Sequence, residues 1–350
     1  MRVVIVGATG NIGTSLVEVL TADEQIDAVV GIARRRPEWQ PAKTTWVQAD
    51  ASSDELETHF QGADAVVQLA WIFQPTHDEL ATWRNNVLGS MRVFDAAARA
   101  GVGALIYASS VGAYSPGPQN HAVDESWPTH GLPTAAYGRE KAYLERVLDT
   151  FERQHSAIRV VRLRPGFIFK REAASEQRRL FAGPLLPTTL TRPSLLPVVP
   201  DLPGLRLQAL HSLDAAEALR LAIVRPVRGA FNIAADPVLD ARTLGELLGA
   251  RPIKLPVWPI RAAVAAAWKL HLVPASPTLL DLALRVPIMD ITRAHSELGW
   301  NPSRTSCDAI REFLGGLREG GGMATPPLHP SAGGRLREKE LATGVGQRAT

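Results

Sequence analysis

Short apolar runs alternate with helical stretches along the first half of the chain. The runs are RVVIVGA, AVVGIA, TTWVQAD, AVVQLAW, ALIYASS and IRVVRLRPG. Between them, stretches such as residues 11–20 and 79–100 repeat apolar residues with helical spacing. The runs lack polar alternation, so they fit strands that are buried on both faces. The pattern predicts an α/β fold in which helices cover both faces of a parallel sheet.

After Gly166 this rhythm weakens. Six prolines between Gly183 and Gly204 predict an ordered but irregular segment beside a cleft. GAFNIAA then returns as a strand, and two later stretches, RAAVAAAWKLHL and SPTLLDLALRV, read as helices. We therefore expect a Rossmann-like doubly wound domain over 1–168, with a returning part at about 205–240. A smaller C-terminal substrate-binding domain would hold 169–204 and 241–318.

Composition places limits on the class of protein. The 350 residues are 45% hydrophobic and 21% charged, and the formal net charge is +3. We expect 319–350 to be a disordered tail, because it is rich in glycine and proline and has little to bury. The segment from Gly321 onward carries a net charge of +2, so the body is close to neutral, which argues against a nucleic-acid or membrane partner.

The single cysteine, Cys307, excludes an intramolecular disulfide and a cysteine-clustered metal site, so we expect no metal. It fits a reducing cytoplasm best. The start of the chain runs directly from a strand into a glycine turn, which does not resemble a signal peptide. No later run is apolar enough to predict a membrane span.

The first candidate site is the glycine-rich stretch VVIVGATGNIG. Gly7, Gly10 and Gly13 follow an apolar strand at the start of a helix, with Asn11 and Ile12 between the last two. Glycines here permit a tight turn and let backbone amides approach a pyrophosphate at the positive helix N-terminus. The context predicts a dinucleotide site, whereas an isolated glycine triplet is often only a turn.

The second apolar run bears on the choice of nucleotide. It ends GIARRRP, so Ala33 stands where an acidic residue usually binds the ribose hydroxyls of NAD. Arg34 and Arg35 follow and could pair with a 2′-phosphate, although a solvated basic turn is the alternative. We favour NADP as the cofactor, with NAD as the alternative.

Tyr137 and Lys141 form the candidate acid–base pair. Residues four apart lie on one helical face, and Tyr143 has no such ammonium partner. A nearby ammonium would lower the pKa of the Tyr137 phenol toward the range useful for proton transfer. Tyrosine and lysine at this spacing are common on helices, so the pair alone is weak evidence.

Together, the motifs resemble the extended short-chain dehydrogenase/reductases, the NAD-dependent epimerase/dehydratase family. The likeness covers about 2–314, and it rests on the glycine loop, YASSVGAYS, Tyr137 with Lys141, RPG and ELGWNP. It implies that Ser110 completes the site with Tyr137 and Lys141, with Ser109 as the adjacent alternative. Tyr137 would transfer the proton, Ser110 would bond the reacting oxygen, and Lys141 would also hold the nicotinamide ribose.

Other positions follow more loosely from the resemblance. It implies that cofactor contacts extend to Asp50, Ala51, Leu69, Ala70, Trp71 and Pro165. Trp71 could instead be core, and Asn86, which matches a recurrent asparagine, could be structural. Many relatives dimerise through two helices, here 79–100 and 135–154, so we expect a homodimer.

The reaction class stays partly open. Sugar-nucleotide dehydratases carry Asp-Glu where this chain has Val111 and Gly112, so dehydration lacks its acid–base pair. Epimerisation and simple oxidation or reduction by hydride transfer both remain. Basic residues in the smaller domain would suit a nucleotide sugar, whereas apolar stretches there would suit an apolar carbonyl compound. The alternative from another class is a non-catalytic NADP-binding sensor of the same fold.

Overall fold

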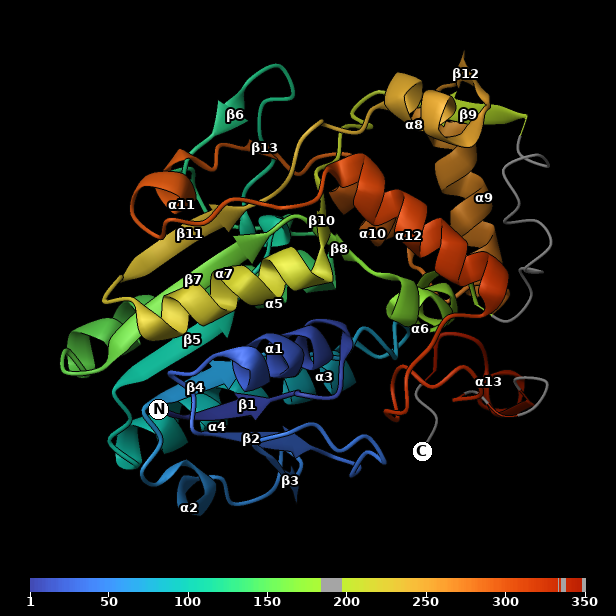
Figure 1. Ribbon diagram of the computed structural model, residues 1–350. Helices are drawn as coiled ribbons and strands as arrows, with labels where there is room; N and C mark the ends of the chain where they lie inside the picture. Colours follow the sequence, from blue (N-terminus) through green and yellow to red (C-terminus); the bar gives the residue numbers. More distant parts are fainter. Residues whose placement is uncertain (184–196, 333, 335–337, 348–350) are drawn as a thin grey trace.

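A seven-stranded parallel sheet forms the centre of the larger domain. The computed structural model describes residues 1–183, 197–332, 334 and 338–347. The strand order is β11-β7-β5-β4-β1-β2-β3, which confirms the predicted Rossmann-like doubly wound sheet (Figure 1). The strands are β1 (Arg2–Val6), β2 (Ala28–Ala33), β3 (Thr44–Gln48), β4 (Ala65–Gln68), β5 (Ala104–Ala108), β7 (Arg159–Pro165) and β11 (Gly229–Ile233).

Two helical layers bury the two faces of this sheet. On one face, α1 (Asn11–Ala22) packs beside α7 (Ser212–Val224), and Leu16 and Leu219 share a core with Ile5. The other face is covered by α2 (Glu57–Phe60), α4 (Gly89–Arg99) and α5 (Ala136–Gln154). The apolar strands predicted this arrangement, because both of their faces had to be buried.

The helix that leads into α4 contains an irregularity. It begins as α3 (Glu79–Thr82), continues as the π-helical turn η1 (Trp83–Leu88) and then becomes α4. The sequence predicted one continuous helix over 79–100. Single π-helical turns within α-helices occur frequently at functional sites, where they redirect side chains.

The rest of the chain builds a smaller part beside the carboxyl ends of the strands (Figure 1). Three short parallel pairs stabilise it: β8 (Phe167–Phe169) with β10 (Ala209–His211), β9 (Val198–Asp201) with β12 (Arg251–Lys254), and β6 (Ala122–Val123) with β13 (Ile288–Met289). Its helices are α6 (Ala174–Gln177), α8 (Ala241–Leu248), α9 (Val257–Lys269), α10 (Pro277–Ala283) and α12 (Ser306–Glu319), whereas α11 (Thr292–Ser296) packs beside β11 of the large sheet. Most of the proline-rich segment, 184–196, lies outside the described residues.

Parts of the expected disordered tail instead pack on the body. Thr325 is buried and its hydroxyl donates to the Thr9 carbonyl in the glycine loop at 2.9 Å. Leu328 is fully buried, and the Gly346 carbonyl accepts from the backbone of Thr76 at 2.9 Å. A short helix, α13 (Glu338–Thr343), lies between these contacts. Buried side chains such as Thr325 and Leu328 thus hold parts of a segment whose average composition predicted disorder.

Candidate active site

The glycine loop is shaped by close backbone contacts. Gly7 has φ +91°, and a Cβ there would lie 2.6 Å from the backbone nitrogen of Ala70. A Cβ on Gly13 would lie 2.4 Å from the Gly7 carbonyl oxygen. Gly10, by contrast, has a single neighbour at 3.6 Å, and as the N-cap of α1 it makes no side-chain capping bond. The backbone amides at the start of α1 therefore suit a pyrophosphate, as the motif predicted.

The other predicted cofactor residues gather at the same edge of the sheet. Because β1 to β4 and β7 are parallel, the segments that follow them meet at their carboxyl ends. Arg34 and Arg35 are exposed directly after β2. The remaining predicted positions at this edge are Asn11 and Ile12 at the start of α1, Asp50 and Ala51 after β3, Leu69, Ala70 and Trp71 after β4, and Pro165 at the end of β7. This edge thus has the residues that a dinucleotide would need.

The structure separates Ser110 from the alternative, Ser109. The Ser109 hydroxyl donates to the buried Glu145 carboxylate at 2.6 Å. Ser110 begins the turn η2 (Val111–Ala113) and is hydrogen-bonded to Tyr137. A Cβ on Gly112 would lie 2.8 Å from Cε1 of Tyr137, so this glycine leaves room for the phenol ring. Ser110 is therefore the serine that faces the tyrosine.

The pKa of Tyr137 is raised, whereas the sequence predicted that Lys141 would lower it. Burial raises the pKa of Tyr137 to about 12, although its hydrogen bond with Ser110 acts in the lowering direction. The ammonium of Lys141 lies 6.0 Å from the centre of the Tyr137 ring and donates instead to the Ala108 carbonyl at 2.7 Å. Lowering of the tyrosine pKa by lysine is thus absent from this arrangement. At neutral pH the phenol stays protonated, which suits proton donation.

Lys141 itself is buried beneath an aromatic side chain. Its ammonium lies 3.7 Å from the centre of the Trp71 ring, a cation–π geometry. Burial lowers the pKa of Lys141 to about 7, opposed by the carboxylates of Glu140 and Glu145. Trp71 also meets Tyr137 edge-on, with ring centres 5.6 Å apart. Trp71 is therefore part of the site and does not act only as core.

Two further residues fix this site, and sequence reasoning missed one of them. The Asn86 side chain accepts from the Ile72 backbone amide at 2.8 Å and donates to the Ile72 carbonyl at 2.9 Å. It also donates to the buried Glu140 carboxylate at 2.8 Å, and Thr82 donates to the same carboxylate at 2.6 Å. Asn86 is thus structural, and it holds the segment that carries Trp71. Glu140 could have been found as a carboxylate one helical turn after Tyr137.

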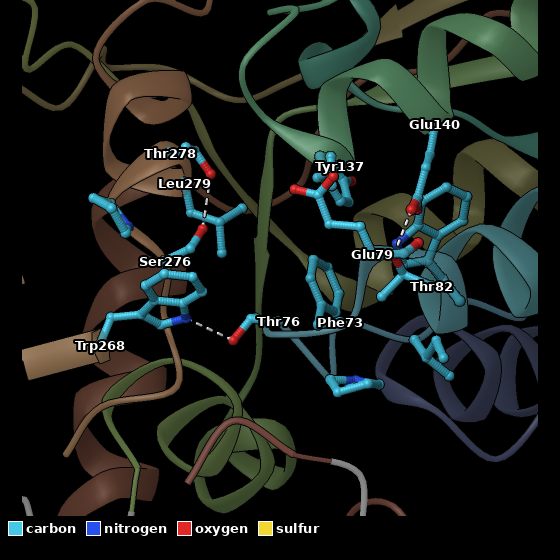
Figure 2. A pocket seen from close by; sticks show the side chains of 15 residues that line it. Phe73, Thr76, Glu79, Thr82, Tyr137, Glu140, Trp268, Ser276, Thr278 and Leu279 are labelled. Atoms are coloured by element: carbon cyan, nitrogen blue, oxygen red, sulfur yellow. Dashed lines mark hydrogen bonds between the residues drawn. The ribbon is translucent and has the colours of Figure 1, made fainter. Parts of the chain in front are cut away.

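A pocket opens beside Tyr137, as Figure 2 shows. On one side, Phe73 stacks on the Tyr137 ring with centres 5.3 Å apart. On the other side lie Trp268 from α9 and residues 276–279 at the start of α10. Among the described residues that line it, Glu79 and Glu140 carry charge and none is basic. The described lining therefore offers aromatic and hydroxyl groups but no cation for a diphosphate.

Five basic residues of the smaller domain would suit a nucleotide sugar: Lys170, Arg171, Arg178, Arg179 and Arg192. Three of them contact other parts of the chain. Lys170 is buried and donates to the hydroxyls of Thr14 and Ser15 at 2.6 and 3.1 Å. Arg171 pairs with Glu319, and Arg179 donates to the Pro327 carbonyl. Arg192 lies outside the described residues. These contacts weaken the case for a diphosphate substrate.

Comparison with known proteins identifies the family of the chain. The model of the NAD dependent epimerase/dehydratase family matches residues 3–234. An uncharacterized protein of Mycobacterium tuberculosis is 26% identical over 321 residues, which are 91% of this chain but only 30% of that protein. Sterol-4-alpha-carboxylate 3-dehydrogenase (decarboxylating) of Saccharomyces cerevisiae is 37% identical over 84 residues, or 24% of each chain.

Solved structures share the fold at low sequence identity. UDP-glucose 4-epimerase of Thermotoga maritima, solved with UDP-glucose, has a TM-score of 0.69 and is 18% identical. UDP-glucose 4-epimerase of Thermus thermophilus, solved with NAD, has a TM-score of 0.66 and is 22% identical. Each match covers 91% of this chain and 99% of the other. At these identities the likeness supports the architecture alone.

Proposed function

Because the chain belongs to the NAD dependent epimerase/dehydratase family, we propose that it is an NADP-preferring oxidoreductase acting on an apolar carbonyl or carbinol compound. The observation that carries the proposal is the partly buried, protonated Tyr137 beside Ser110, at the end of a pocket whose described lining has no basic residue. When bound, the nicotinamide cofactor supplies or accepts the hydride.

The residues of the chain take distinct parts in this scheme. Ser110 hydrogen-bonds the substrate oxygen and orients it, while the Tyr137 hydroxyl donates a proton to that oxygen as a carbonyl is reduced. Lys141 holds the nicotinamide ribose, and Gly7, Gly10 and Gly13 leave room for the pyrophosphate. The aromatic walls, Trp71 and Phe73, exclude water from the reacting atoms. Because the chain keeps Ser110, Tyr137 and Lys141, an enzyme is favoured over a non-catalytic NADP-binding sensor.

The choice of substrate distinguishes a reductase of apolar carbonyl compounds from an epimerase of nucleotide sugars. We expect purified protein to oxidise NADPH in the presence of uncharged aromatic or alicyclic ketones and aldehydes, monitored by cofactor absorbance. UDP-glucose should be neither epimerised nor protective against proteolysis, because the described pocket lining has no cation for its diphosphate. Epimerisation of UDP-glucose, detected by NMR, would show that the substrate proposal is wrong.

The arginines after β2 motivate the cofactor preference. We predict that NADP binds at least several-fold more tightly than NAD in calorimetry. Changing Arg34→Ala together with Arg35→Ala should erase this difference, because charge-assisted bonds to the 2′-phosphate are lost. Arg153→Ala, an exposed arginine at the end of α5, serves as a control that keeps the preference. Tighter binding of NAD by the unmodified protein would contradict the proposal.

The homodimer also stays a proposal. Leu80 and Leu88 are exposed, and Trp83 packs on the exposed Tyr143 of α5 with ring centres 4.9 Å apart. Val87, which lies between Leu80 and Leu88 on the expected helix 79–100, is buried within its own domain, so only some apolar residues of this helix are exposed to a partner. Light scattering should give twice the 37.8 kDa of one chain, and Leu80→Glu with Leu88→Glu should halve that mass. A monomeric wild type would refute the dimer.

A further inference from the structure

One end of the molecule carries an apolar surface that includes a whole helix. We define the α9 surface as β9, β12, α9 and the residues up to Leu272. None of the 13 residues of α9 is buried, although the helix is mostly apolar. Trp258 is 73% exposed and Leu270 is 69% exposed. Of the eleven large apolar side chains exposed on the described residues, six lie here, the others being Val198, Ile253, Leu255 and Leu272. Such clustering marks an interaction site, whereas single exposed residues do not.

Charge on this surface is one-sided. From residue 251 to 272 the sequence holds four basic residues and no acidic one: Arg251, Lys254, Arg261 and Lys269. Acidic neighbours are few: Asp281 of α10 pairs with Arg261 at 2.9 Å, and Glu246 of α8 pairs with Arg242 at 3.1 Å. Asp201 of β9 lies opposite Lys254 in the parallel register. Basic residues thus outnumber acidic ones around the exposed apolar side chains, and this combination complements an anionic lipid surface.

The length and position of α9 limit how this helix can contact a bilayer. With 13 residues, α9 is too short to span a membrane, and among the described residues no helix is long and apolar enough to cross one. Trp258 stands in its first turn, while Lys269 and Leu270 stand at its end. Figure 1 shows α9 with β9 and β12 at the side of the molecule away from β1 to β3. A helix presented in this way can lie in the plane of the headgroups.

We propose that the α9 surface docks on anionic membranes, with Trp258 and Leu270 inserted at headgroup depth and the basic side chains on the lipid phosphates. The near-neutral body argued against such a partner, but the local distribution of charge outweighs that average. Since α9 also contributes Trp268 to the pocket, one helix connects the docking surface with the space beside Tyr137. The proposal does not depend on the reaction that the pocket performs.

Cosedimentation with vesicles tests it and needs neither cofactor nor substrate. The unmodified protein should pellet with vesicles of phosphatidylcholine and phosphatidylserine, and much less with phosphatidylcholine alone or at high salt. Trp258→Glu with Leu270→Glu should abolish binding. Lys254→Ala and Lys269→Ala should each weaken it by about five-fold, because a basic residue near an anionic surface contributes roughly that factor.

Leu341→Glu is the matched control, because Leu341 is 51% exposed on α13, outside this surface. It should bind vesicles like the unmodified protein, and circular dichroism should show that every variant melts as the wild type does. No pelleting with phosphatidylserine vesicles would overturn the proposal, as would equal pelleting by the Trp258→Glu, Leu270→Glu variant. Absence of vesicle binding together with a halved mass for that variant would instead identify a contact between copies of the chain, which also overturns it.

Discussion

Replacing Tyr137 with phenylalanine is expected to lower turnover by about 10²- to 10⁴-fold, the usual contribution of general acid–base catalysis. The change removes one hydroxyl from a ring that is held by Phe73 and by the edge of Trp71. The ring contacts remain, so the site keeps its shape. Cofactor affinity, measured by calorimetry, should therefore stay within a few-fold of wild type while steady-state turnover falls.

Tyr143→Phe is the matched control for this experiment. Tyr143 belongs to the same helix, α5, but is 43% exposed and packs on Trp83 away from the pocket. Its hydroxyl has no part in the proposed chemistry, so turnover should be unchanged. If Tyr137→Phe retains turnover within a few-fold, the proton comes from another group and the assignment of Tyr137 is wrong.

The parts that sequence predicted well depend on local rules. The buried strands follow from uninterrupted apolar runs, and the glycine loop follows from the spacing of its three glycines directly after β1. Tyr137 and Lys141 share a helical face because they are four residues apart. For these features, the family resemblance and the physical argument from the local sequence predict the same residues.

The parts that sequence missed depend on contacts between distant segments. Tyr137 is partly covered by Phe73 and Trp71, which lie more than 60 residues earlier in the chain, so its raised pKa could not be predicted from the lysine spacing alone. The partnership of Glu140 with Asn86 depends on the π-helical turn, which has no clear sequence pattern. The sequence predicted a disordered tail because its apolar content is low. The burial of individual side chains such as Leu328 cannot be predicted from that average composition.

A buried ionic cluster holds the segment that leads to Ser110. Glu145 of α5 is fully buried and accepts from Arg164 at 3.0 and 2.9 Å and from Arg162 at 3.2 Å. Arg164 also donates to the Tyr114 hydroxyl at 2.9 Å. Against the raising effect of burial, the guanidinium of Arg164 lowers the pKa of Glu145 to about 2. Because Ser109 donates to the same carboxylate, the cluster fixes the backbone that leads to Ser110.

Changing Glu145→Ala is expected to lower the free energy of unfolding by about 3–5 kcal/mol, because the buried guanidinium of Arg164 loses its carboxylate. Urea denaturation at neutral pH measures the loss. The wild type should also lose stability as pH falls from about 4.5 toward 2, because the folded state holds this carboxylate ionised at a pH where the unfolded chain is protonated. That part of the acid dependence should be missing from the Glu145→Ala variant.

Glu57→Ala is the control. It breaks the exposed pair with Arg99 and should lower the free energy of unfolding by no more than about 1 kcal/mol. A similar small loss for Glu145→Ala would mean that the cluster relaxes or admits water, and that it does not hold Ser109 in place.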